Sequence, residues 1–135
     1  MPELPEVESV RLGLEKNIVG KKVKSVQVLH SRATNTQSIA PLSSIAGAKI
    51  EMVKRRGKFL WITFNRPEVL VGHLGMSGQF LITNKNEPDQ KHLRVRFDLG
   101  KYELRFIDQR TFGWLAIDEN IDEVPKMVSH IACLL

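Results

Sequence analysis

The chain has 135 residues, a length that suits one domain able to bury about two-thirds of the surface its unfolded form exposes. It carries 20 Lys and Arg against 15 Asp and Glu, a net charge of +5, so we expect a polyanionic partner, with nucleic acid the first choice and anionic membrane the second. The start resembles no signal peptide and no apolar run is long enough to span a bilayer, so we expect a soluble intracellular protein. Because Cys133 is the single cysteine, an internal disulfide and a cysteine-rich zinc site are excluded.

The first six residues place a proline and two carboxylates at the end of the chain. If Met1 is removed, Pro2 presents a secondary amine, and α-amino groups titrate near ~8, which leaves a useful fraction unprotonated at neutral pH. Such an amine can attack an electrophilic carbon and form an iminium, with Glu3 and Glu6 as candidate proton carriers. The alternative is structural, since proline and acidic residues also favour the first turn of a helix.

Apolar residues then recur at helical spacing from Val7 to Ile18 and stop before Gly20, which predicts one amphipathic helix. Beyond Gly20 the apolar period changes to two, which predicts short strands. We expect these strands at residues 23–28, 50–53, 59–64, 69–71, 79–82, 93–99, 102–107 and 114–117. Frequent turn signals between them favour an antiparallel sandwich or barrel.

Three segments between or after these strands are predicted to be irregular. Residues 30–44 are polar and indicate a loop with a short helix, and residues 84–90 indicate a flexible excursion. Residues 125–135 are typical of a linker or the start of a helix.

Two clusters in the middle of the chain are candidates for binding. A basic run at residues 54–58 leads into a strand, although a charge run is as often a solvated face. The segment 72–78 contains three glycines, which permit a tight loop with positive φ and a close approach by another backbone. Met76 lies within this loop and would be exposed there, although methionine is more often a core residue.

A third cluster, residues 108–113, holds Arg110 and Phe112 in a predicted turn. An exposed apolar side chain beside an arginine could enter a base stack and fill the space left by an extruded base. The local alternative is an ordinary connection with Phe112 packed inward. Basic residues at 92, 94 and 96 alternate with apolar ones, which predicts a strand with one basic face, whether for nucleic acid or only for water.

Together these motifs resemble the formamidopyrimidine-DNA glycosylases, which excise oxidised purines and then nick the abasic strand. The resemblance runs from Met1 to about residue 125 and is carried by four motifs in order: MPELPE at 1–6, RRGK at 55–58, HLGMSG at 73–78 and DQRTFG at 108–113. It implies a mostly β fold with helices (α+β), in which an N-terminal helix packs on a two-layer antiparallel β-sandwich. The related endonuclease VIII branch is less similar, because glycine is typical there in place of Leu4.

The resemblance also implies roles for single residues, which we keep as expectations. Pro2 would attack the sugar C1′ to displace the damaged base and form an imine, Glu3 would act as general acid on the sugar ring, and Glu6 would support the site. Lys58 would contact a DNA phosphate and assist β-elimination, which δ-elimination follows. The remaining residues are expected to contact DNA, with the last three filling the void left by the flipped nucleotide: His92, Met76, Arg110 and Phe112.

The expected partner is double-stranded DNA with an oxidised purine or an abasic site, bound by a monomer without a membrane, in a bacterial-type cytoplasm. We assign residues 1–124 to a catalytic N-terminal domain and 125–135 to a truncated linker. The helical and zinc-finger domains that continue other family members are expected to be absent, so no cofactor is expected in this chain. Gln109 and Thr111 stand where many relatives have proline and arginine, beside the proposed void-filling residues.

Three other functions stay open at this stage. A non-catalytic DNA-binding remnant would keep the basic face without turnover. A small-molecule tautomerase would use an N-terminal proline as a base, but would leave the basic residues and the exposed loops without a purpose. A structural or interaction module would need neither DNA nor Pro2.

Overall fold

Helix α1 (Leu4–Ile18) forms because its apolar residues return to one face at every turn. Val7, Leu14 and Ile18 on this face are buried, whereas Leu12 is exposed. The helix ends before Gly20, whose φ of +88° is the left-handed conformation that commonly stops a helix. The predicted amphipathic helix is confirmed, and it begins in the N-terminal motif. The computed structural model describes residues 4–110, 112–121 and 124–132.

Two antiparallel sheets follow, in the strand orders β1-β6-β7-β5 and β2-β3-β4-β8-β9. Their strands are β1 (Ser25–Val28), β2 (Ile50–Arg56), β3 (Phe59–Phe64), β4 (Glu68–His73), β5 (Gly78–Asn84), β6 (Leu93–Asp98), β7 (Tyr102–Asp108), β8 (Trp114–Ile121) and β9 (Val124–Pro125). Each strand expected from the sequence is present, and β9 is the additional one. Along β6 the residues Leu93, Val95 and Phe97 are buried and alternate with half-exposed ones, so the two-residue period is confirmed.

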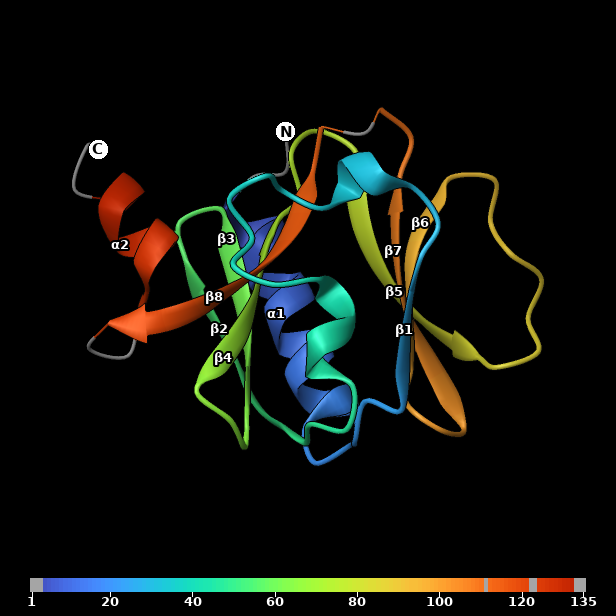
Figure 1. The fold of residues 1–135 in the computed structure, drawn as a ribbon. Coiled ribbons are helices and arrows are strands. Elements are labelled where there is room, and N and C mark those ends of the chain that lie inside the picture. Colours follow the sequence, from blue (N-terminus) through green and yellow to red (C-terminus); the bar gives the residue numbers. More distant parts are fainter. Residues whose placement is uncertain (1–3, 111, 122–123, 133–135) are drawn as a thin grey trace.

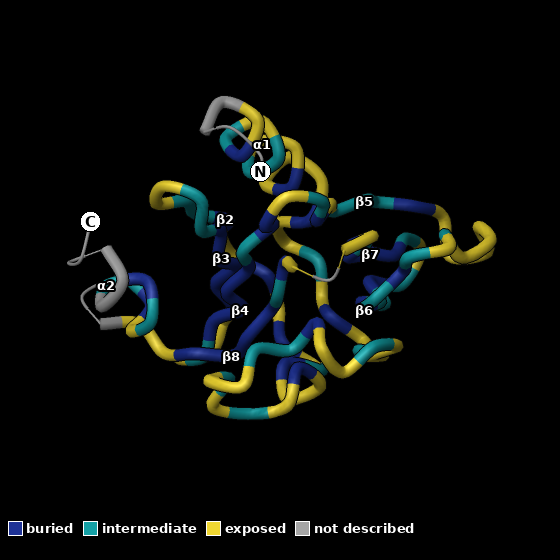
Figure 2. Tube along the Cα trace, turned by 90° about the horizontal axis from the view of Figure 1, so that it is seen from above, coloured by how far each residue is buried: buried dark blue, intermediate teal, exposed yellow. Residues whose placement is uncertain are grey.

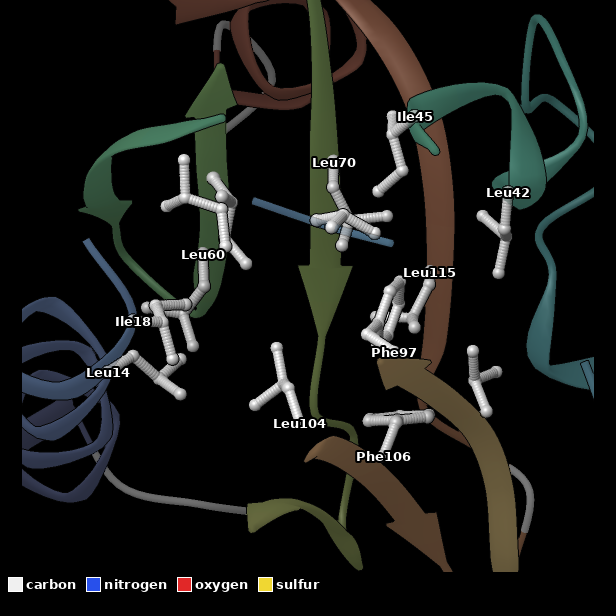
Figure 3. Packing of buried hydrophobic residues seen from close by; sticks show 14 of the residues in the cluster. Leu14, Ile18, Leu42, Ile45, Leu60, Leu70, Phe97, Leu104, Phe106 and Leu115 are labelled. Carbon is white, nitrogen blue, oxygen red and sulfur yellow. The ribbon is translucent and has the colours of Figure 1, made fainter. Parts of the chain in front are cut away.

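The main core lies between the two sheets and beside α1 (Figure 3). Helix α1 lies along one open side of the sandwich, and the segment between β1 and β2 lies along the other (Figures 1 and 2). That segment contains two short 3-10 helices, η1 (Ser31–Ala33) and η2 (Leu42–Ile45), and the second contributes Leu42 and Ile45 to the core. The expected two-layer antiparallel sandwich with an N-terminal helix is confirmed.

A smaller cluster covers the outer face of the five-stranded sheet. Helix α2 (Lys126–Ala132) packs Val128 against Trp61, Val69 and Val71 there. Asp118 accepts the Met127 N–H at 2.8 Å, which satisfies one of the free backbone donors at the start of the helix. Part of the segment expected as a linker is therefore a short helix. Within the described part of the chain, neither helix is both long and apolar enough to cross a bilayer.

The excursion at residues 84–90 is anchored by Arg105, a fully buried arginine of β7. The Arg105 guanidinium donates to the carbonyl oxygens of Glu87 at 2.7 Å and Pro88 at 2.9 Å, and to the Gln90 side chain at 3.1 Å. Its positive charge is balanced by Glu103, 2.8 Å away and itself buried. A buried charge is tolerated only when it is paired and hydrogen-bonded, and both conditions are met here.

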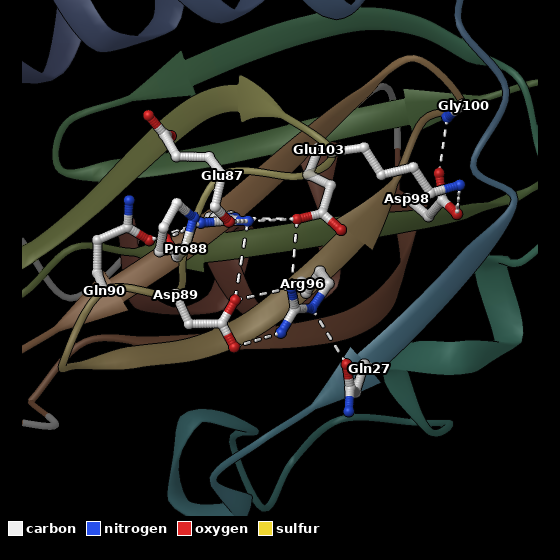
Figure 4. Close-up of polar contacts among 11 residues, drawn as sticks. Gln27, Glu87, Pro88, Asp89, Gln90, Arg96, Asp98, Gly100 and Glu103 are labelled. Carbon is white, nitrogen blue, oxygen red and sulfur yellow. Dashed lines mark hydrogen bonds and ion pairs between the residues drawn. The ribbon is translucent and has the colours of Figure 1, made fainter.

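Arg96 on β6 belongs to the same network. It lies 2.8 Å from Asp89 and 3.4 Å from Glu103, and it also donates to the Gln27 side chain at 3.1 Å (Figure 4). The pKa of the Asp89 carboxyl is lowered, chiefly by its hydrogen bond with Arg96. The face of β6 that carries Arg94 and Arg96 is therefore basic in composition, but the Arg96 side chain stabilises the fold through these ion pairs.

Alanine substitutions of a buried and of an exposed leucine should differ clearly in their effect on the free energy of unfolding. Leu104→Ala removes a side chain that is 1% exposed, and we expect the free energy of unfolding to fall by about 2–5 kcal/mol because the neighbours cannot fill the cavity. Leu12→Ala, at a position 53% exposed on α1, should change it by less than about 0.5 kcal/mol. Urea denaturation of both variants measures the difference, and equal losses would contradict this core.

Candidate functional site

Strand register brings the conspicuous segments of the sequence to one end of the sandwich. In the five-stranded sheet Phe59 pairs with His73, and His73 pairs with Trp114. In the other sheet Gly78 pairs with Asp108. The turn between β2 and β3, the connection from β4 to β5 and the connection from β7 to β8 therefore share this end, together with the start of α1 (Figure 1).

Two of these connections cross between the sheets and touch each other. The β4–β5 loop (residues 74–77) passes from the five-stranded to the four-stranded sheet, and the β7–β8 loop (residues 109–113) returns. Gly75 has a φ of +62°, and a Cβ on it would lie 2.9 Å from the Gly113 nitrogen. A Cβ on Gly113 would lie 2.8 Å from the carbonyl oxygens of His73 and Leu74. Side chains are excluded at this contact, which accounts for both glycines.

A cleft of about 380 Å³ separates the start of α1 from the β4–β5 loop and β5. Glu6 and Val10 of α1 line one side, and Met76, Gln79 and Phe80 are among the residues on the other. Met76 is 55% exposed, so it is not the core residue that methionine more often is. Glu6 is exposed as well.

Pro2 and Glu3, the predicted nucleophile and general acid, lie outside the described residues. Helix α1 begins at Leu4, and Glu6 in its first turn lines the cleft. The described start of α1, at Leu4, lies at the end of the sandwich that carries the two crossing loops (Figure 1).

The β7–β8 loop presents the other predicted DNA-contacting side chains. Phe112 is 59% exposed, which excludes the alternative that it packs inward, and Arg110 is exposed beside it in sequence. Phe112 lines a second hollow, of about 470 Å³, together with Arg32 and Asn35 from the segment after β1. The Arg110 N–H donates to the Ser77 hydroxyl oxygen at 3.1 Å, which joins this loop to the loop of Met76.

His73, at the end of β4, is a candidate site residue that the sequence indicated only as part of the HLGMSG motif. Its ring stacks on Trp114 with centroids 5.9 Å apart, and the Phe59 ring meets it edge-on at 5.0 Å. The Nδ1 atom accepts the Gly75 N–H at 3.1 Å, so the neutral ring carries its proton on Nε2. Burial lowers the pKa of His73, and the positive charge of Lys58 lowers it further. Its place in HLGMSG, directly before the glycine loop, is the signal that could have identified it.

Lys58 follows Gly57 in the turn between β2 and β3 and is half-buried. Its electrostatic effect on His73 brings the basic RRGK motif and the HLGMSG motif into one site. His92 directly precedes β6, and its carbonyl oxygen accepts the Asp108 N–H at 3.1 Å, so this predicted contact also borders the β7–β8 loop.

A cluster of charges ties α1 to the β2–β3 hairpin. Glu8 accepts hydrogen bonds from Arg11 and from Arg55, each at 2.8 Å at the closest, and these bonds lower the pKa of Glu8 to about 2. Arg11 also donates to the Val53 carbonyl oxygen at 3.2 Å. Arg55 therefore serves to position the helix, three residues before Lys58.

Comparison with known proteins gives the family. The model of the formamidopyrimidine-DNA glycosylase N-terminal domain matches residues 1–115. The chain belongs to the formamidopyrimidine-DNA glycosylase family. Proteins of this name from Nocardioides sp. and Parafrankia sp. are 44% and 47% identical to it over 140 and 146 residues. Each alignment covers 98% of this chain but only 47% and 50% of the relative, so the chain spans about half the length of these relatives.

Solved structures of the family agree with the fold. The Lactococcus lactis glycosylase in complex with DNA containing an abasic site has a TM-score of 0.87 at 29% identity. A complex of the inhibited L. lactis enzyme with DNA containing N7-benzyl-Fapy-dG has a TM-score of 0.86 at 30% identity. These matches cover 98% of this chain and 47% and 48% of the solved chains. The family is one of DNA glycosylases that repair oxidised bases, and its solved members bind damaged or abasic DNA.

The electrostatic link between Lys58 and His73 can be tested directly. We expect the pKa of His73 to lie below 6.5 and to rise in Lys58→Met, because removal of the nearby positive charge makes the imidazolium less costly. Nitrogen-edited NMR titration measures this pKa and also reports the tautomer, which should be Nε2–H.

Lys101→Met is the matched control, since Lys101 lies at the β6–β7 turn beside Tyr102 and should leave the pKa of His73 unchanged. An identical His73 pKa in Lys58→Met and in the wild-type chain would contradict the proximity of the Lys58 ammonium group to the His73 ring.

Proposed function

We propose that this chain carries the catalytic part of a DNA glycosylase and AP lyase that removes oxidised purines, such as 8-oxoguanine and formamidopyrimidines, from double-stranded DNA. The observation that supports it best is the cleft between Glu6 and Met76, beside the exposed Phe112 loop, in a chain of this family. Pro2 precedes Glu6 by four residues in the sequence, so its amine would start near that cleft. The side chains able to enter DNA would then surround the nucleophile.

In the proposed reaction, the Pro2 nitrogen attacks the sugar C1′ while its proton is released. The bond between C1′ and the base nitrogen breaks, and the base leaves with that electron pair and a proton. Glu3 protonates the ring oxygen as the ring opens, which gives an iminium between Pro2 and the sugar. Loss of a C2′ proton then expels the 3′ phosphate, and a second elimination expels the 5′ phosphate.

The described residues have assigned roles in this scheme. Glu6 supports the proton transfers from the wall of the cleft. Lys58 and His92 bind phosphates by charge and hydrogen bonding, which fixes the register of the strand. Met76, Arg110 and Phe112 occupy the space of the flipped nucleotide, because an extruded base leaves unstacked neighbours that need a replacement surface.

We expect this chemistry to need no metal ion, since the amine itself is the electrophile-trapping group. Within the ranges that the structure describes, no three His, Cys, Asp or Glu side chains gather as a metal site would require. Trapping in the presence of a chelator should therefore equal trapping without it.

The second candidate is a domain that binds DNA without turnover. It is favoured by one observation, that the relatives are about twice as long as this chain. Such a domain would keep the phosphate contacts of Lys58 and His92 without turnover.

Borohydride trapping distinguishes the two candidates. The chain, with removal of Met1 verified by mass spectrometry, is mixed with duplex DNA carrying one 8-oxoguanine or one abasic site, and any imine is reduced to a stable adduct. The matched control carries the same residues behind an N-terminal extension, which converts the Pro2 amine into an amide and should abolish the adduct. Pro2→Gly, which keeps an amine but loses the secondary one, should lower the trapping rate.

Each result decides one question. An adduct on both substrates supports the whole proposal. An adduct on the abasic site alone supports the imine chemistry and overturns base excision by this chain. No adduct on either substrate, together with retained DNA binding, favours the non-catalytic domain.

A further inference from the structure

Asp108, the last residue of β7, has a fully buried carboxylate that receives hydrogen bonds from both crossing loops. The Ser77 hydroxyl of the β4–β5 loop donates to its Oδ1 atom. In the β7–β8 loop, the Arg110 N–H donates to Oδ1 at 3.2 Å and the Gly113 N–H donates to Oδ2 at 2.6 Å. The side chain therefore joins the segment of Met76 to the segment of Arg110 and Phe112.

The backbone of Asp108 is held in place independently of its side chain. Its N–H donates to the His92 carbonyl oxygen at 3.1 Å, and its carbonyl oxygen accepts the Arg94 Nε–H at 2.9 Å. Gly78, the first residue of β5, is its partner in the ladder. The carboxylate thus projects from a rigid strand end into two loops that have no strand partner of their own.

A carboxylate suits this position better than a neutral group. The two oxygens face donors from the hydroxyl and from two backbone amides, and an ionised carboxylate accepts at both oxygens whereas an amide side chain accepts at one. Hydrogen bonds to an ionised acceptor are also about twice as strong as neutral ones.

From this geometry we propose that Asp108 is a positioning residue, which holds Met76 and Phe112 as one rigid wedge for entry into a DNA duplex. The inference rests on the proposed function, in which these side chains replace an extruded nucleotide. Met76 and Phe112 are both more than half exposed and have little packing of their own. Their fixed separation depends on the Gly75–Gly113 contact and on the carboxylate that ties both loops together.

Rigidity matters because insertion has to work against base stacking. A side chain that enters a base step must supply the free energy of unstacking. If the loops had to be ordered at the same moment, the entropy of ordering would add to that cost. Because Asp108 already joins the two loops, this ordering cost is avoided. Loss of its carboxylate should therefore weaken insertion into duplex DNA but leave the reaction with single strands unchanged, since single strands need no unstacking.

Two variants and one matched control test the proposal. Asp108→Asn keeps the shape but replaces one acceptor by a donor, and Ser77→Ala removes the two hydrogen bonds of the Ser77 hydroxyl, to Asp108 and from the Arg110 N–H, while the carboxylate stays. Asp118→Asn is the control, because Asp118 is also a buried carboxylate that accepts a backbone N–H, but it caps helix α2 away from the two loops. Circular dichroism checks that all three fold, and Ser77→Ala keeps the test decisive if Asp108→Asn does not.

The first measurement is amide hydrogen exchange in the free protein. We expect exchange to be faster in Asp108→Asn, on the order of tenfold or more at Gly113, because the amide side chain offers one acceptor oxygen in place of two charged ones. The rise at Arg110 should be smaller, because the Ser77 hydroxyl oxygen also accepts its N–H at 3.1 Å. Ser77→Ala should raise exchange at Arg110 to a smaller extent, and Asp118→Asn should leave both amides unchanged. Unchanged exchange in Asp108→Asn would overturn the proposal that Asp108 holds the two loops together, irrespective of the result of any DNA-binding measurement.

The second measurement uses a duplex with a tetrahydrofuran site next to 2-aminopurine, whose fluorescence rises when it unstacks. The wild-type chain and Asp118→Asn should raise the fluorescence, and Asp108→Asn should reach half the rise only at a concentration on the order of tenfold higher, because its loops have to be ordered as the side chains insert. Borohydride trapping on a single-stranded abasic oligonucleotide should stay within about twofold in all variants, since no stack is opened there.

The two proposals fail differently. A wild-type chain without an adduct on either the duplex or the single strand contradicts the proposed chemistry, while exchange and fluorescence still judge the wedge. The proposal of a rigid wedge is overturned if the wild-type chain binds the duplex without a fluorescence rise. It is also overturned if Asp108→Asn gives the same fluorescence rise as the wild-type chain at the same concentrations. Equal losses on duplex and single strand in Asp108→Asn also overturn it, because they indicate general damage to the site.

Discussion

The backbone contact between Gly75 and Gly113 is the constraint on which the rest of the site depends. The chain changes sheet at both loops, and the two crossings meet at a distance that leaves no space for a side chain. The loops touch through their backbones, which leaves Met76 after Gly75 and Phe112 before Gly113 outside the contact, whereas Leu74 before Gly75 is buried. Met76 and Phe112 are exposed for this reason, although both residue types usually favour burial.

The same layout explains why only part of the positive charge is available for DNA. Arg105 and Arg96 hold the excursion before β6, and Arg11 and Arg55 hold α1 through Glu8. These ion pairs position the elements that carry Lys58, His92 and the N-terminal residues. The 20 Lys and Arg residues therefore overstate the number of cations available at the proposed interface, and the arrangement at one end of the sandwich contributes more than the total. A tautomerase would need none of this arrangement, and the family match gives it no support.

Periodicity was sufficient to predict α1, an antiparallel sandwich or barrel and the alternating strand β6, because these elements are stabilised by a repeated apolar pattern, whereas the two-layer arrangement was implied by the family resemblance. It could not predict that Arg105 anchors residues 84–90 through their carbonyl oxygens, since nothing local signals partners 17 and 18 residues away. Nor could it decide between exposed and buried Phe112, which depends on the contact between the loops. His73 was missed because its partners, Phe59 and Trp114, come from other strands. The roles of Pro2 and Glu3 stay predictions.

The central claim is that DNA binds at the end of the sandwich where the β2–β3, β4–β5 and β7–β8 connections meet the start of α1. The most direct test is NMR titration of the isotope-labelled chain with a short duplex that contains one tetrahydrofuran site. We expect the largest shift changes at residues 57–59, 73–78, 92–94 and 108–113, and little change in α2 or at the opposite turns near residues 65–67 and 100. Shift changes concentrated on α2 and the outer face of the five-stranded sheet, with the two crossing loops unaffected, would contradict the account.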